Sequence, residues 1–98
     1  MATLFIVVFQ GAGSVAHGDP IQEEVVSIGA GSLTSNVITG SDRKRRIVRM
    51  YADADCFVTW GETPTALTDG TDGRPLGSDN AEYFDVEAGH KIAVIQRI

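Results

Sequence analysis

The chain has 98 residues, a formal net charge of −5 and one cysteine. This length holds a single domain, the acidic balance argues against a general nucleic-acid binder, and one cysteine excludes an internal disulfide. Apolar residues make up 43% of the chain and charged residues 21%, which is typical of a globular domain with one core.

The N-terminal stretch, Leu4 to Gln10, reads LFIVVFQ and predicts a strand over residues 3–10. It is too short for the core of a signal peptide or for a membrane span. We therefore expect no membrane partner, and synthesis in the cytoplasm of the producing cell. Two interpretations stay open: a central strand covered on both faces, or an arm over residues 1–10 that pairs with a neighbouring subunit. In the second interpretation the candidate contact residues are Leu4, Ile6 and Val8.

The next segment is a glycine-containing loop over residues 11–20, followed by predicted strands over 21–28 and 33–39. The loop sequence GAGSVAHG lacks the Gly-Lys-Ser/Thr ending of a phosphate-binding loop, and no helical pattern follows it. We expect no nucleotide site here.

The only run of charge is Arg43-Lys44-Arg45-Arg46, which holds four of the eight basic residues. The rest of the chain is therefore strongly acidic. One interpretation is a solvated loop that leads into a strand. The other is an electrostatic contact for an acidic partner surface.

The stretch from Ile47 to Thr65 alternates between apolar and polar residues and predicts strands over 46–52 and 56–60, joined by a tight turn. Cys56 shares a face with Val58 and Trp60, so we expect a buried, unreactive thiol. Trp60 is interpreted as a core residue or, alternatively, as an interface anchor, a choice that also applies to Tyr83.

Residues 66–80 form a long polar segment with Asp-Gly turn dipeptides, which predicts a loop that is functional or mobile. Strands over 82–86 and 91–97 follow. No segment has helical periodicity. The sequence therefore predicts an all-β fold: a small antiparallel β-sandwich, jelly-roll-like, with about seven strands in one domain over residues 1–98.

The candidate chemical groups are few. Asp53 and Asp55 could share a strand face as an acid–base pair, but such residues more often flank a turn. Three aspartates, Asp69, Asp72 and Asp79, match no known calcium-loop spacing. His17 and His90 lie far apart in the sequence, and Cys56 is alone, so no zinc spacing exists. We expect no catalytic centre, metal or cofactor, and no enzyme.

Several motifs resemble a family of small virion proteins of tailed bacteriophages. The matching residues are Arg49-Met50-Tyr51-Ala52-Asp53-Ala54-Asp55-Cys56, Gly61-x-x-Pro64-Thr65-Ala66, Pro75-Leu76, Glu82-Tyr83-Phe84 and Gly89-x-Lys91-Ile92-Ala93-Val94-Ile95. With a looser fit upstream, the resemblance spans about three quarters of the chain. It implies a head decoration (cement) protein that binds the capsid exterior, with the major capsid protein as its partner.

The alternatives are a small tail or fibre component, or a carbohydrate- or receptor-binding β module. An aromatic platform on exposed loops would favour the module, and only Trp60 and Tyr51 are candidates for it. We also expect self-association, with a trimer favoured over a two-fold dimer because capsids offer local three-fold positions.

Overall fold

The computed structural model describes residues 2–9, 21–38, 45–66 and 73–97, and these residues form strands without any helix. No helix of the described part is thus long and apolar enough to cross a membrane. The strands are β1 (Thr3–Phe9), β2 (Gln22–Ser27), β3 (Leu33–Thr34), β4 (Arg45–Ala52), β5 (Cys56–Gly61), β6 (Arg74–Leu76), β7 (Ala81–Glu87) and β8 (Lys91–Gln96).

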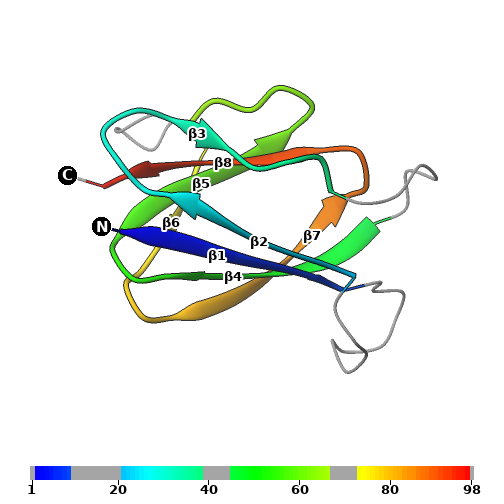
Figure 1. Cartoon of the computed structure of the whole chain (residues 1–98), viewed down its shortest axis with the longest axis horizontal. Coiled ribbons are helices and arrows are strands. Elements are labelled where there is room, and N and C mark those ends of the chain that lie inside the picture. Colours follow the sequence, from blue (N-terminus) through cyan, green and yellow to red (C-terminus); the bar gives the residue numbers. More distant parts are fainter. Residues whose placement is uncertain (1, 10–20, 39–44, 67–72, 98) are drawn as a thin grey trace.

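The strands form two four-stranded antiparallel sheets packed as a sandwich (Figure 1). The first sheet has the order β2-β1-β4-β7 and the second the order β3-β8-β5-β6. Every connection except β1–β2 and β5–β6 passes from one sheet to the other. This alternation is the winding of a jelly roll, so the predicted fold class is confirmed.

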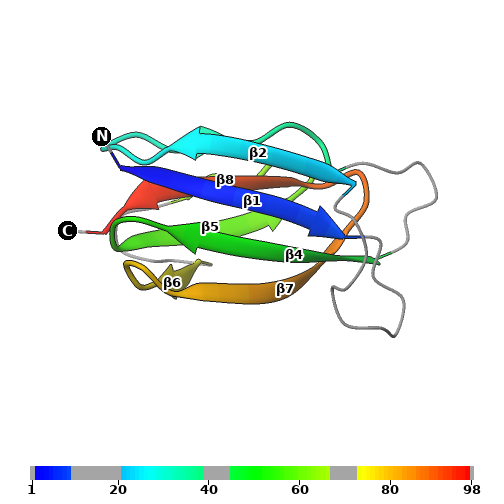
Figure 2. The same cartoon turned by 60° about the horizontal axis from the view of Figure 1, so that its bottom comes forward.

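In the usual jelly roll, the last strand of the chain lies at this position in the sheet. In this protein the first strand, β1, takes that position, between β2 and β4. Figure 2 shows these strands side by side in one layer. As a consequence the N- and C-terminal ends of the chain lie at the same end of the sandwich (Figure 1). The backbone N–H of Ile28, which donates to the Ala2 carbonyl at 2.9 Å, extends the β1–β2 pairing at that end.

The core lies between the sheets and follows the period of two that the sequence shows. Most strands contribute side chains that are almost wholly buried, and in β1, β4 and β5 these alternate along the strand. The largest of them are Leu4, Ile6, Ile38, Met50, Leu76 and Ile92. Burial of such side chains stabilises each by roughly 1.5–3 kcal/mol relative to exposure, which holds the two layers together.

Two predicted elements differ from the structure. The segment predicted as a polar loop over 66–80 contains the short strand β6, which pairs with β5 through Cys56↔Leu76 and buries Leu76. The strand predicted over 33–39 is regular only at Leu33–Thr34. Beyond it the chain still runs beside β8, because the Ser35 N–H donates to the Ile92 carbonyl and the Ile38 N–H to the His90 carbonyl.

Candidate functional site

The three contact residues predicted in β1 are not on the surface. Leu4, Ile6 and Val8 are 0%, 1% and 0% exposed. They point into the sandwich because β1 is a central strand of its own sheet, paired with β2 and β4. The prediction of these side chains as a contact surface is therefore corrected: they form core, and the residues between them face outward.

The outward face of the β2-β1-β4-β7 sheet, called the open face below, carries several apolar and aromatic side chains, with Glu23 and Arg49 among them. Val25, Tyr83 and Phe5 are 62%, 56% and 39% exposed. Soluble proteins rarely expose contiguous apolar surface unless it binds something. The strand register places on this face Phe5, Val7, Phe9, Glu23, Val25, Ile47, Arg49, Tyr51 and Tyr83, with Thr3, Ser27, Ala81 and Asp85 around them.

The strand register arranges the open face in rows that run across the strands. One row is Val25, Phe5 and Tyr51, and the next is Glu23, Val7, Arg49 and Tyr83. The Phe5 and Tyr51 rings lie 6.0 Å apart between centroids, and the Arg49 guanidinium lies 5.7 Å from the centre of the Tyr51 ring. A groove of about 290 Å³ runs over β1 and β2 on this face, between the β1 side chains and those of Glu23 and Val25.

The outward face of the other sheet is covered by the chain itself. Ala93 and Ile95 of β8 are 0% and 5% exposed because Ala66 packs on them, with Phe57 beside them. The Ala66 N–H donates to Ser32 Oγ at 3.0 Å, which fixes the segment after β5 over the sheet. We call these four residues the covered face.

The four residues of the predicted basic contact do not share one environment in the structure. Arg43 and Lys44 lie outside the described residues, and Arg45 begins β4. Arg46 is only 8% exposed and pairs in register with the buried Val86, so its side chain projects inward with those of Val48 and Met50. Arg46 is therefore not an exposed contact residue.

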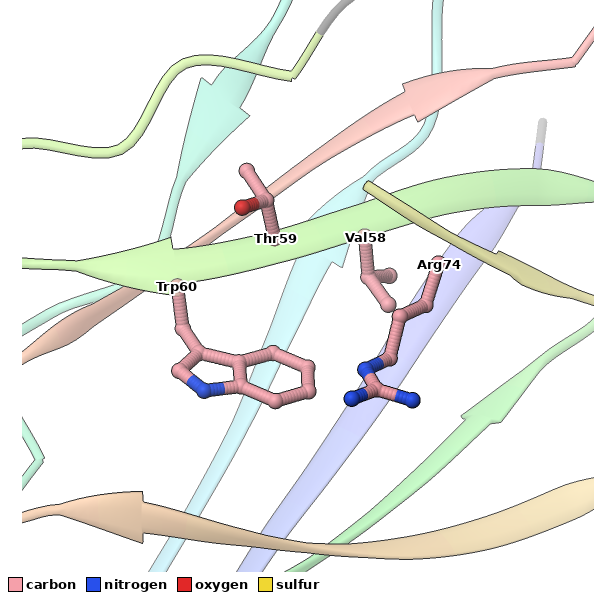
Figure 3. A pocket seen from close by; sticks show the side chains of 4 residues that line it. All are labelled: Val58, Thr59, Trp60 and Arg74. Carbon is pink, nitrogen blue, oxygen red and sulfur yellow. The ribbon is translucent and has the colours of Figure 1, made fainter. Parts of the chain in front are cut away.

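A small pocket lies at the edge of the sandwich where the end strands β6 and β7 belong to different sheets. It has a volume of about 220 Å³ and is lined by Val58, Thr59, Trp60 and Arg74. In Figure 3 the side chains of Val58, Trp60 and Arg74 project from the same side of the sheet toward β7, and Thr59 points the other way.

Aromatic rings and one cation close this edge. The rings of Trp60 and Phe84 lie 4.9 Å apart, and the Arg74 guanidinium lies 5.7 Å and 5.8 Å from their centres. Trp60 and Phe84 also pack against the main core. The prediction that Trp60 belongs to the core is thus correct for the part of the side chain that packs there, while Trp60 also lines the pocket.

The acidic residues beside the turns hold backbone amides. Asp53 Oδ1 accepts from the Thr3 N–H at 2.7 Å, and Asp55 Oδ1 accepts from the Ser78 N–H at 2.8 Å. The Ser78 N–H and then Arg97, which is 3.1 Å away, lower the pKa of Asp55. These two carboxylates therefore have separate structural roles, in agreement with the interpretation that they flank a turn.

Asp79 has a positive φ of 62° and accepts a hydrogen bond from the Tyr51 hydroxyl at 2.9 Å. This bond, with some burial, raises the pKa of Tyr51. The other two aspartates that were considered as calcium ligands, Asp69 and Asp72, lie outside the described residues, as does His17.

Cys56 is fully buried beside the core, as predicted. Burial raises the pKa of its thiol to about 11, which keeps it in the unreactive protonated form at neutral pH. His90 Nε2 lies 3.5 Å from Glu87 in the β7–β8 turn. In the described ranges no three His, Cys, Asp or Glu side chains form a group that could hold a metal ion.

The open face is the feature that sequence reasoning missed. Its signal was present, because Phe5, Val7 and Phe9 make the N-terminal run apolar on both sides of the strand. That pattern predicts cover on both faces. The structure supplies the core on one side, and on the other side Phe5, Val7 and Phe9 remain partly exposed.

In comparisons with known proteins, no family model, no curated protein and no solved structure matches the chain.

Proposed function

We propose that this protein is a structural component of a tailed-phage virion that binds the capsid exterior and stabilises the head. The open face is the observation that carries this proposal. A sheet face with exposed apolar side chains is suited to lie against another protein. Decoration of a shell needs such a surface and needs no substrate cavity.

The motif residues that resemble phage head proteins support the proposal through the scaffold. Met50, Ala52, Cys56 and Leu76 are all 0% exposed, so these motif positions build the core. Gly89 has a φ of +98°, a conformation that residues with a Cβ rarely adopt. The shared residues are thus those that a rigid sandwich of this shape requires.

The proposed partner is the major capsid protein, and the proposed location is the outer surface of the virion head. Each copy contributes contacts of modest strength, and many copies on a lattice add their contacts through multivalency. In a cement protein, contacts to the shell and between neighbouring copies both contribute.

The test compares purified particles with and without this protein under heating or osmotic shock. We expect particles that lack it to lose their contents at lower temperature, and added protein to restore resistance. A Phe5→Ser/Val25→Ser variant should restore less, whereas Glu62→Gln, an exposed change away from the open face, should restore fully. Equal survival with and without the protein, together with density on the tail, would overturn the proposal.

The basic segment gives a second arm of the same test. We expect Arg43→Gln/Lys44→Gln/Arg45→Gln to weaken shell binding and to reduce its salt dependence, because exposed charges are screened by salt. Arg46 is left unchanged in this variant because it is buried. Binding that is equally strong and equally salt-dependent in the variant would remove this segment from the interface.

The second candidate function is a tail or fibre component that binds a carbohydrate or receptor. The pocket beside Trp60 and Arg74 favours it, since aromatic faces and guanidinium groups are common in sites for sugars and small anions. Trp60→Ala would then abolish binding to a glycan array and leave shell binding unchanged. The decoration proposal predicts the absence of such glycan binding.

A further inference from the structure

The open face carries a negatively charged residue and a positively charged residue on opposite sides of β1. Glu23 pairs in register with Val7, and Val7 pairs with Arg49. The carboxylate and the guanidinium therefore lie one strand to each side of Val7, at about 4.8 Å per strand. Within the described part of the chain, no ion pair involves either side chain.

In the neighbouring row, apolar or aromatic side chains also lie on both sides of β1. Val25 lies on one side of Phe5 and Tyr51 on the other. If a second copy were related to the first by a 180° rotation about an axis along β1, each position on β2 of one copy would face a position on β4 of the other. The rotation would therefore set Val25 against Tyr51 and Glu23 against Arg49, with Phe5 and Val7 near the axis.

We infer that the open face binds a second copy of this chain, face to face, about a two-fold axis that runs along β1. In this arrangement each Glu23 meets the other copy's Arg49, so the interface contains two equivalent ion pairs around an apolar centre. Sheets that pack face to face lie about 10 Å apart, and an isologous contact of this kind closes after two copies. The contact is a dimer rather than the trimer expected from capsid symmetry.

The shape of the open face agrees with this partner. The groove of about 290 Å³ lies over β1 and β2. In the two-fold arrangement the side chains that project from β1 and β4 of the second copy lie above that groove. Tyr83 on β7 lies two strands from the axis and is left at the rim.

This inference refines the proposed function: it assigns the open face to the contact between neighbouring copies and leaves shell binding to other surfaces. It rests on the proposed function only for the idea that protein covers this face. The isolated chain is sufficient to test it. Sedimentation velocity and light scattering of the full chain should show a concentration-dependent dimer at micromolar to millimolar protein. Glu23→Arg and Arg49→Glu should each raise the dissociation constant at least tenfold, because each places like charges opposite one another.

The double variant Glu23→Arg/Arg49→Glu should restore the dimer, since it exchanges the charges and keeps the pairs. Glu62→Arg serves as the matched control, as Glu62 is exposed outside the open face. Thermal melting of each variant separates loss of association from loss of folding. A folded double variant that stays monomeric would contradict the inference.

Cross-linking tests the position of the axis. Val7→Cys should be joined efficiently by a short bis-maleimide, because the two Val7 positions face each other across about 10 Å. Tyr83→Cys, in the same row but two strands away, should not be joined. The buried Cys56 of the parent chain gives the background.

Three outcomes would overturn the inference: a wild-type monomer at millimolar concentration, a dimer that the charge reversals leave unchanged, or cross-linking of Tyr83→Cys in place of Val7→Cys. A monomer whose open-face variants lose shell binding would assign the face to the shell and leave the proposed function intact. A dimer that follows these predictions but does not bind capsids would sustain the inference and defeat the proposed function.

Discussion

Both sheets direct apolar side chains outward, but the described chain covers only one of the two outward faces. On the covered face, Ala66 packs on Ala93 and Ile95, and the Arg97 guanidinium lies 5.8 Å from the centre of the Phe57 ring. On the open face, Val25 and other large side chains remain exposed.

The difference shows that the same sequence pattern, a continuously apolar strand, can lead either to a covered outward face or to an exposed one. One of the two inner strands of each sheet is continuously apolar, as LFIVVF in β1 and IAVI in β8. Such a run predicts burial on both sides. For β8 the second cover comes from residues of the same chain; for β1 we infer that it comes from a second copy.

The largest expected effect opens the covered face. Ile95→Ala should lower the free energy of unfolding by about 2–5 kcal/mol, because it leaves a cavity under Ala66. Val25→Ala on the open face should change it by less than about 0.5 kcal/mol in the monomer. Urea unfolding at low protein concentration measures both. Equal losses in the two variants would mean that both faces are buried in the monomer.

The sequence predicted most of the fold because each strand has its own local signal. The alternation from Val48 to Ala52 and from Cys56 to Trp60 marks β4 and β5, one inner strand of each sheet, and their inward faces. The structure buries these positions as predicted, Trp60 in part. Strand β6 was missed because three residues with a proline do not form a periodic pattern. Only its pairing with β5 makes it a strand.

The candidate site was harder to predict because it depends on register and topology. Arg46 looks like part of an exposed basic run in the sequence, yet its parity with Val48 directs it inward. Glu23 and Arg49 are 26 positions apart in the sequence and become neighbours of Val7 only through strand pairing. No local pattern contains that information.

The second prediction tests the core that both sheets share. Cys56→Ser should cost about 1–3 kcal/mol, because it places a hydroxyl in apolar surroundings. The wild-type thiol, with its raised pKa, should react with a thiol reagent only as the chain unfolds. Dimer formation should be unaffected once the variant is folded. Rapid labelling of the native protein would show that Cys56 is accessible and that the two layers are less closely packed.

A smaller effect concerns the attachment of the covering segment. Ser32→Ala removes the acceptor of the Ala66 N–H and should cost about 1 kcal/mol. Ser27→Ala, an exposed serine at the end of β2, is the matched control and should be neutral. Unfolding in urea measures the difference. If the two serine variants are equally stable, apolar contacts alone hold Ala66 over Ile95.

The smallest effect is electrostatic and depends on pH. Asp55 holds Arg97, whose guanidinium covers Phe57, and the pKa of Asp55 is lowered by the Ser78 N–H and by Arg97. A lowered pKa in the folded state means that the ionised carboxylate stabilises the fold above its ordinary pKa of about 4. That stabilisation is lost as the pH falls through the lowered value. Asp55→Asn should therefore reduce Tm at pH 7.

The difference in Tm between wild type and Asp55→Asn should shrink as the pH is lowered and vanish once Asp55 is protonated. Thermal melts from pH 7 to pH 2 measure it, with Glu62→Gln as an exposed control that keeps the wild-type profile. The same variant should leave self-association unchanged, because Asp55 and Arg97 help to cover the other sheet and lie outside the open face. A difference that persists at the lowest pH would mean that Asp55 acts through the shape of its hydrogen bonds and that its charge contributes nothing to the cover.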